Sequence, residues 1–188
     1  TGGMIALIGA MMVGPRVGRV FGSAPKPHNL LIATLGTFIL WFGWYGFNVG
    51  STLAAGAPNI MGLVAINTTL AAGAGALGGL FYLYVRTKKW DLPAVLNGSL
   101  AGLVGITAPC AFVSPTAAVI IGAVSGVVVM ISIAVIERLK IDDAAGAFSV
   151  HGTCGALGTL AIGFWALPSL TGGPAGLFAG GGFDQLII

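Results

Sequence analysis

The sequence predicts an all-α protein, a polytopic bundle of transmembrane helices, and composition carries most of this prediction. Hydrophobic residues make up 56% of the 188 residues and charged residues only 7%, whereas a soluble domain carries about 25% charged residues. The apolar residues form uncharged runs of about 20 residues, which is the length that a helix needs to cross a bilayer. Glycine occurs 32 times, which suits membrane helices whose backbones pack closely.

The apolar runs give the order of the helices. Gly2–Val13 is too short to span a bilayer, so we expect the inner end of a helix that begins before Thr1. A last run begins at Phe183, and we expect the chain to be a piece of a longer protein, cut at both ends. Five full spans are expected between them: Leu30–Ser51, Asn59–Val85, Leu92–Val113 with a break near Pro109, Pro115–Ile136 and Ala144–Leu167.

The loops predict how these spans are oriented. All eight basic residues lie in the alternate loops 14–29, 86–91 and 137–143, and the loops between them carry none. By the positive-inside rule these three loops are cytoplasmic, so Leu30–Ser51 runs outward. The basic residues are Arg16, Arg19, Lys26, Arg86, Lys88, Lys89, Arg138 and Lys140.

Four spans contain two glycines at the GxxxG spacing, which lets helix backbones approach without large side chains between them. Four such motifs in successive spans predict a compact bundle. The pairs are Gly46/Gly50, Gly75/Gly79, Gly98/Gly102 and Gly122/Gly126.

The outer end of the first full span carries an aromatic stripe. Trp44, Phe47 and Ser51 lie at i, i+3 and i+7, so they share one face of a helix. Aromatic ring faces attract cations, and a hydroxyl can accept a hydrogen bond from one. Such stripes also pack cores or form interfacial belts. The predicted position of the stripe at the exterior end of its span favours a site that binds an incoming solute.

His151 is the one ionisable side chain within a predicted span, and such a residue is a functional hypothesis by default. Small residues at helical spacing around it, including Cys154 and Gly158, would leave room for a narrow passage. The alternative is a structural histidine bonded to a backbone carbonyl. The spacing of His151 and Cys154 permits shared metal ligation, but one pair is weak evidence and we predict no metal site.

Other polar residues receive structural roles. His28 lies in a cytoplasmic loop, and Asn48 is expected to form hydrogen bonds across helices. The acidic pair Asp142 and Asp143 precedes a helix, where carboxylates cap the first turn and meet the positive end of the helix dipole.

Several motifs resemble those of the ammonium transporter family, which comprises the Amt, Mep and Rh proteins. Their order and spacing agree with the family pattern, and the resemblance covers essentially the whole chain. The motifs are Gly14-Pro-Arg-Val-Gly18, Lys26-Pro-His-Asn29, Trp41-Phe-Gly-Trp-Tyr-Gly-Phe-Asn-Val-Gly-Ser51, Asn97-Gly-Ser-Leu-Ala-Gly-Leu-Val-Gly105, Asp142-Asp-Ala-Ala-Gly-Ala-Phe-Ser-Val-His-Gly152 and Phe178-Ala-Gly-Gly-Gly-Phe-Asp-Gln185.

The resemblance implies the ammonium-transporter fold, with residues 1–188 as one partial transmembrane domain, a fragment of an 11-helix protein from the end of helix 5 to the start of helix 11. It also implies roles for four residues in substrate binding and conduction. Phe47 matches one of two gate phenylalanines, and Ser51 matches the hydroxyl of an outer ammonium recruitment site. Trp44 matches an aromatic of the conduction pathway, and His151 matches the second of two lumen histidines. The first histidine would lie just before Thr1.

The function that this resemblance implies is transmembrane transport of ammonium or ammonia through an apolar pore in the plasma membrane. We expect a homotrimer, a PII-type regulator on the cytoplasmic face and no nucleic-acid partner. We expect neither enzymatic activity nor a cofactor. Two alternatives remain: an ammonium sensor of the same fold coupled to a cytoplasmic signalling domain, and an Rh-type gas channel.

Overall fold

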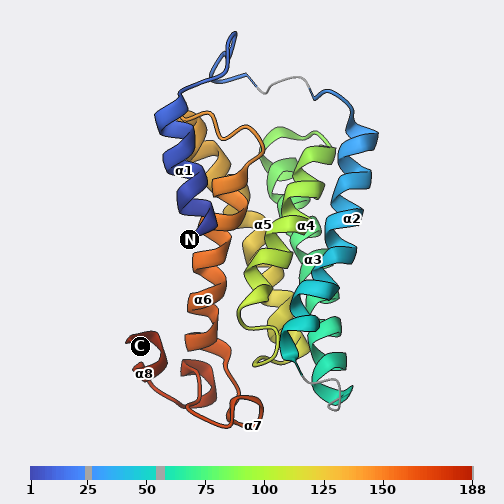
Figure 1. The fold of residues 1–188 in the computed structure, drawn as a ribbon, viewed down its shortest axis with the longest axis vertical. Helices are drawn as coiled ribbons and strands as arrows, with labels where there is room; N and C mark the ends of the chain where they lie inside the picture. The colour runs from blue at the N-terminus through green and yellow to red at the C-terminus, as the bar shows by residue number, and fades with distance from the viewer. Residues whose placement is uncertain (24–26, 54–57, 188) are drawn as a thin grey trace.

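The computed structural model describes residues 1–23, 27–53 and 58–187, and every regular element in them is helical. Pro25, Lys26, Ile188 and residues 54–57, which lie between the first two expected spans, are therefore outside the described residues. The long helices run up and down side by side (Figure 1). They are α1 (Gly2–Val13), α2 (Leu30–Asn48), α3 (Pro58–Thr87), α4 (Leu92–Thr107), α5 (Pro115–Arg138) and α6 (Cys154–Trp165).

Shorter elements complete the chain. A π-helix, Phe148–Thr153, leads directly into α6, and we call it the π segment. Two single turns, α7 (Pro168–Thr171) and α8 (Asp184–Ile187), lie at the end of the bundle where α6 ends (Figure 1). Two 3₁₀ turns follow α2 and α7, at Gly50–Thr52 and Leu177–Ala179.

The helices begin where the sequence supplies caps. The Asn29 side chain accepts hydrogen bonds from the amides of Leu31 and Ile32 at the start of α2. Asp91 accepts one from the amide of Ala94 in α4. Each of these bonds satisfies an amide that has no partner within its own helix.

In the described part of the chain, three helices are long and apolar enough to cross a membrane: Leu30–Thr52, Pro58–Thr87 and Pro115–Arg138. The other two expected full spans are not single unbroken helices. The break expected near Pro109 is confirmed: α4 has 16 residues and ends at Thr107, because Pro109 cannot continue it. The helix of the last span begins at Ala147, three residues later than expected, and its π-helical part begins at Phe148. Residues 144–146 form a turn and a bend there instead of helix.

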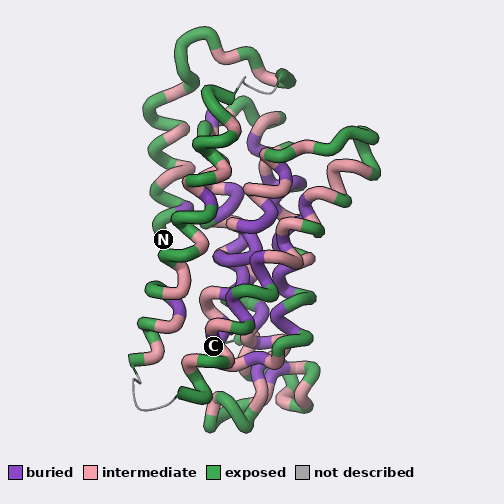
Figure 2. Tube along the Cα trace, turned by 90° about the vertical axis from the view of Figure 1, so that its right-hand side faces the viewer, coloured by how far each residue is buried: buried purple, intermediate pink, exposed green. Residues whose placement is uncertain are grey.

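The core is a three-helix contact among α3, α4 and α5, and three of the four glycine pairs build it. At five of these six glycines a side chain would overlap the backbone of a neighbouring helix, and at Gly79 it would lie 3.0 Å from the carbonyl oxygen of Ala94. Gly75 packs against Gly98 and Gly102 of α4, and Gly126 of α5 packs against Gly75. Buried backbone is concentrated in these helices (Figure 2). The members are Gly75, Gly79, Gly98, Gly102, Gly122 and Gly126.

The fourth pair, Gly46/Gly50, does not follow the prediction within this chain. A side chain at either position would meet nothing within 4 Å among the described residues. Helix α2 stands at the edge of the bundle, and only 6% of the residues in its most apolar 18-residue stretch are buried. Its glycines therefore contribute nothing to the core described above.

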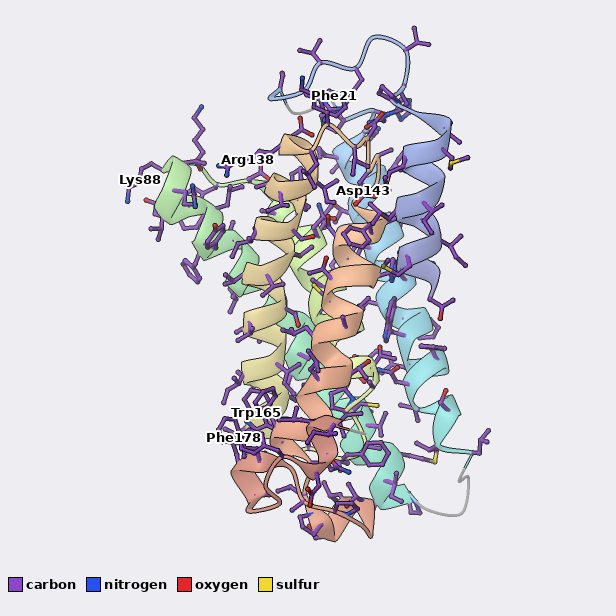
Figure 3. The ribbon with its side chains drawn as sticks, turned by 90° about the vertical axis from the view of Figure 1, so that its left-hand side faces the viewer. Phe21, Lys88, Arg138, Asp143, Trp165 and Phe178 are labelled. Carbon is purple, nitrogen blue, oxygen red and sulfur yellow. The ribbon has the colours of Figure 1, made fainter. Side chains whose placement is uncertain are left out.

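The basic loops meet at one end of the molecule. Lys88, Arg138 and Phe21 lie together at one end, and Trp165 and Phe178 lie at the other (Figure 3). This arrangement agrees with the expected alternation of loops. It also places the aromatic end of α2 away from the positive charges (Figure 1).

Candidate functional site

The predicted aromatic stripe forms at the end of α2. Trp44 and Phe47 meet edge to face, with ring centroids 6.2 Å apart and planes at 83°. Ser51 lies in the 3₁₀ turn that follows, and its hydroxyl donates a hydrogen bond to the carbonyl of Phe47 at 2.6 Å. Phe47 and Ser51 are both exposed. The three residues thus form a continuous line along one face.

Trp44 extends this line to His151. The indole and imidazole rings are stacked, with centroids 6.3 Å apart and planes 9° from parallel. The indole Nε1 donates a hydrogen bond to Thr107 Oγ1 at 2.9 Å, and that hydroxyl donates in turn to the carbonyl of Leu103 at 2.7 Å. All four predicted site residues are therefore connected, and Thr107 is a supporting residue that sequence reasoning missed.

The π segment presents His151 to Trp44. Asp143 caps its start by accepting hydrogen bonds from the amides of Phe148 and Ser149 at 3.2 and 3.1 Å, and from the Ser149 hydroxyl at 3.2 Å. This confirms the expected capping for Asp143. A π turn adds a residue to the helical turn and changes the direction of side chains that follow, and such turns are frequent at functional sites.

The expected stripe of small residues beside His151 does not form as predicted. Cys154 is fully buried, and its thiol donates to the carbonyls of Ser125 and Ser149 at 3.6 Å. Gly158 packs against the backbone of α4 at Gly105. The His151 side chain is exposed, unlike Cys154 and Gly158. The prediction assumed an α-helical period, whereas the π turn separates His151 from these residues.

The backbone beside His151 is approached closely by α1. Gly3 is buried, and a side chain there would overlap the backbone of His151 and Gly152. The start of α1 therefore lies against the π segment, as the ribbon also shows (Figure 1).

Asp142 has a different role from the predicted capping. Its carboxylate, 3% exposed, accepts hydrogen bonds from Arg16 Nε at 2.7 Å and Arg16 Nη2 at 2.8 Å, and it also pairs with Arg19 at 3.3 Å. Arg19 binds Glu137 in addition. The hydrogen bonds from Arg16 hold the pKa of Asp142 well below its usual range and raise the pKa of Arg16.

This ionic cluster fastens the 14–23 loop to the residues before the π segment. Sequence reasoning missed it because the partners lie more than 100 positions apart along the chain. The signal that could have indicated it is the pairing of two basic and two acidic residues in loops assigned to the same membrane face.

Two intramembrane asparagines link helices, as expected for Asn48. Its amide nitrogen donates to Thr68 Oγ1 of α3 at 3.1 Å. Asn67 donates to the carbonyls of Cys110 and Val113 at 2.8 and 2.9 Å, which holds the turn after α4. Both residues are buried, so neither belongs to the exposed line from Ser51 to His151.

Comparisons with known proteins identify the family of the chain. The model of the Ammonium Transporter Family matches residues 1–188. The chain is 45% identical to ammonium transporter Amt2 of Archaeoglobus fulgidus over 88% of this chain and 36% of that protein. It is 42% identical to ammonium transporter 1 member 1 of Oryza sativa over 96% of this chain and 41% of that protein.

Solved structures give the same result for the fold. Mep2 of Candida albicans matches with a TM-score of 0.87 at 32% identity, over 98% of this chain and 43% of that chain. A sensor Amt protein matches with a TM-score of 0.85 at 39% identity, over 98% of this chain and 44% of that one. The chain thus spans about two fifths of the length of these relatives. It is an integral membrane protein that belongs to the ammonium transporter family.

Proposed function

We propose that the whole protein transports ammonium or ammonia across the plasma membrane, and that Trp44, Phe47, Ser51 and His151 line the conduction path. The family of the chain and the names of its relatives support the substrate. The observation that carries the path is the contact of the Trp44 ring with both Phe47 and His151. One aromatic side chain thus joins the exterior stripe to the histidine.

The outer part of this path suits a cation. The Ser51 hydroxyl uses its hydrogen in a bond to the carbonyl of Phe47, so its oxygen lone pairs are left to accept from an N–H donor. The exposed Phe47 ring lies one turn away and offers a face that attracts positive charge. Together they replace part of the water that hydrates ammonium.

Deeper along the line, an unpaired charge becomes costly because the surroundings are apolar. Burial lowers the pKa of an amine, by as much as about 3–5 units in fully buried cases. In this proposal ammonium loses its proton near Phe47 and continues as ammonia. His151 then offers a weak base that can accept a hydrogen bond or a proton.

The remaining parts of the proposal concern the whole protein. Residues 1–188 form part of one transmembrane domain, and a first lumen histidine lies just before Thr1. The contact of Gly3 with the backbone of His151 and Gly152 supports this placement, because it brings the start of α1 to the histidine. A homotrimer and a PII-type regulator at the basic end complete the assembly that the family implies.

A sensor is the second candidate function. One structural match, at 39% identity, is a sensor Amt protein, so the same membrane fold can serve detection. In a sensor, the line from Ser51 to His151 would bind ammonium without sustained flux. Measurement of uptake by the full-length protein separates the two, because a sensor lacking transport would accumulate no substrate.

Uptake of methylammonium into proteoliposomes that contain the full-length protein tests the proposed path. Trp44→Ala breaks the contacts with Phe47, Thr107 and His151, so uptake should fall at least tenfold. Trp41→Ala is the matched control, because Trp41 lies on the same helix and donates to the Tyr45 hydroxyl instead. Equal uptake by the two variants would remove Trp44 from the path.

A further inference from the structure

Three consecutive residues of α3 hold the two segments that meet at the hydrogen bond between Trp44 and Thr107. These residues are Asn67, Thr68 and Thr69, and we call them the anchor triplet. Asn67 and Thr68 are fully buried, and Thr69 is exposed. The triplet makes hydrogen bonds to two other parts of the chain, which are α2 and the turn after α4.

Asn67 holds the turn that joins α4 to α5. Its amide nitrogen donates to the carbonyls of Cys110 and Val113 at 2.8 and 2.9 Å, and both of these residues are buried. Because both acceptors are carbonyls, only the nitrogen end of the amide can face them. A buried carbonyl that lost its donor would be costly. Asn67 therefore fixes the position of this turn relative to α3.

The turn connects Asn67 to the indole of Trp44. The Cys110 thiol donates to the carbonyl of Thr107, the last residue of α4, at 3.3 Å. The Thr107 hydroxyl oxygen accepts in turn from Nε1 of Trp44 at 2.9 Å. A series of contacts thus leads from a fully buried amide in α3, through the turn, to the ring that contacts Phe47.

The other two residues of the triplet hold α2. Thr68 Oγ1 accepts from the amide nitrogen of Asn48 at 3.1 Å. The hydroxyls of Thr69 and Tyr45 lie 2.7 Å apart and form a second hydrogen bond. Each of these α2 residues directly follows an aromatic residue of the proposed conduction path along the chain. The triplet therefore binds α2 on both of the turns that carry these rings.

The triplet lies beside the close packing of α3, α4 and α5. One turn further along α3, the backbone of Ala71 lies against Gly102 of α4 and Gly122 of α5, where a side chain on either glycine would overlap it. One turn before Thr68, Val64 is fully buried. Closely packed interiors have low compressibility, so α3 gives the triplet a fixed position.

We propose that the anchor triplet positions the Trp44 ring and thereby sets how strictly the conduction path discriminates substrates by size, a role that rests on the function proposed above. The triplet holds the ring from two directions, because it binds both α2 and the turn beside Thr107. A site with fixed walls can discriminate by about 10- to 200-fold between substrates that differ by one methylene group. A ring that shifts gives up part of this discrimination, so the larger substrate gains relative to the smaller one.

Uptake of ammonium and of methylammonium by the full-length protein in proteoliposomes tests this role. The measured quantity is the ratio of the two uptakes, because a loss of folded protein lowers both equally. Thr68→Val keeps the shape of the side chain but removes the hydroxyl that accepts from Asn48. This variant should lower the ratio of ammonium to methylammonium uptake by about three- to tenfold.

Ser125→Ala is the matched control for Thr68→Val. Both residues are fully buried, and each hydroxyl donates to the carbonyl one turn earlier in its own helix. Among the described residues, the Ser125 hydroxyl bonds no other helix, whereas Thr68 also accepts from Asn48. Ser125→Ala should therefore keep the wild-type ratio. An equal shift in both variants would assign the effect to loss of a buried hydroxyl and overturn the proposal.

Asn67→Leu tests the other arm of the triplet, because leucine has a similar volume but cannot donate to the turn. It should lower the uptake ratio as Thr68→Val does, and it should also lower the melting temperature. Gly126→Ala is its control, since this change strains the contact of α3 with α5 two turns away from the triplet. A wild-type ratio in either triplet variant, or an equal shift in Gly126→Ala, would overturn the proposal.

Thr107→Val shows whether Asn67 acts through the Trp44 contact. The substitution removes the acceptor of Trp44 Nε1 with little change of shape, and it should lower the ratio by itself. Adding Asn67→Leu to Thr107→Val should lower it no further, because residues that act through one contact are not additive. Independent effects that multiply in the double variant would overturn the positioning role.

Trp44→Ala in the same assay separates this role from the conduction path itself. Wild-type uptake by Trp44→Ala would overturn the path and, with it, the role of the triplet. Reduced uptake by Trp44→Ala together with wild-type ratios in the triplet variants would leave the path standing and overturn only the positioning role.

Discussion

The Trp44 indole lies nearly parallel to the His151 imidazole, with planes 9° apart and 6.3 Å between centroids. The edge of the imidazole carries both nitrogens, which can take part in hydrogen bonds. Thr107 fixes the indole by accepting from its Nε1. The position of His151 relative to Phe47 is therefore set by a side chain that contacts both rings.

The orientation prediction can be tested by cysteine labelling of Lys88→Cys in intact cells. A membrane-impermeant reagent should fail to label this exposed position, because the loop 86–91 is expected on the cytoplasmic side. Leu53→Cys is the matched control at the opposite end, where Leu53 is 93% exposed. Labelling of Lys88→Cys without permeabilisation would reverse the topology.

Phe47→Ala should change flux or selectivity without loss of insertion. The Phe47 ring is 59% exposed, so its removal should cost little stability, about 0.5 kcal/mol or less. The measurement is uptake of ammonium and of methylammonium by the full-length protein. Phe42→Ala, on the same helix with a ring 79% exposed, should leave both unchanged. An unaltered uptake profile in Phe47→Ala would remove the residue from the pathway.

Gly126→Ala should destabilise the bundle by about 1–3 kcal/mol, because the new methyl group would overlap the backbone of Gly75 and force α3 and α5 apart. Gly62→Ala is the control: nothing lies within 4 Å of that position among the described residues, and alanine favours helix. Thermal unfolding of both variants in detergent compares them. Equal melting temperatures would show that close packing at Gly126 is unnecessary.

The sequence predicted the helices and their contacts where a local rule applies. Apolar runs placed α2, α3 and α5 to within a few residues, and glycine spacing predicted a compact bundle, in which three of the four pairs pack α3, α4 and α5 together. The rule failed for Gly46/Gly50, because spacing alone does not state whether a partner helix lies beside α2. The break predicted near Pro109 is confirmed, since α4 ends at Thr107.

The candidate site was predicted as residues but not as an arrangement. The line from Ser51 to Trp44 follows from helical periodicity, and the structure forms it. The direction of His151 depends on a π turn, which has no periodic signature in the sequence. The Thr107 contact and the ionic cluster at Asp142 join residues distant along the chain, and one sequence cannot show such pairs.

Stability should depend on pH through Asp142. Because its folded pKa is depressed by hydrogen bonds from Arg16, its contribution is complete above the unfolded pKa of about 3.9. The contribution is lost as the pH falls below that value towards the folded pKa. Asp142→Asn should therefore lower the melting temperature at neutral pH, and its difference from wild type should shrink only below about pH 4.

Asp184→Asn is the control for this experiment, because Asp184 is exposed and lies at the other end of the bundle. The melting temperature of Asp184→Asn should equal that of the wild type at every pH tested. A constant difference between Asp142→Asn and wild type at all pH values would assign the loss to packing instead of the ion pair with Arg16.

His151 gives the most informative prediction. It is the one Asp, Glu, Lys, Arg or His side chain within a predicted span, it is exposed, and it stacks on the ring that contacts Phe47. If ammonia crosses as a neutral species beside it, a proton can follow only through a base such as this imidazole. His151→Ala should therefore reduce proton-coupled current more than it reduces folding, since an exposed side chain contributes little to the core.

His151→Asp tests the same position by adding a negative charge instead of only removing the base. A fixed negative charge offsets the cost of desolvating a cation, so this variant should conduct a cation as such, including one of the size of potassium. Electrogenic current and size-exclusion profiles of both variants, measured in the full-length protein, separate conduction from folding. Wild-type current and selectivity in both variants would show that His151 has a structural role, because neither removing the base nor adding a negative charge would then affect the permeating species.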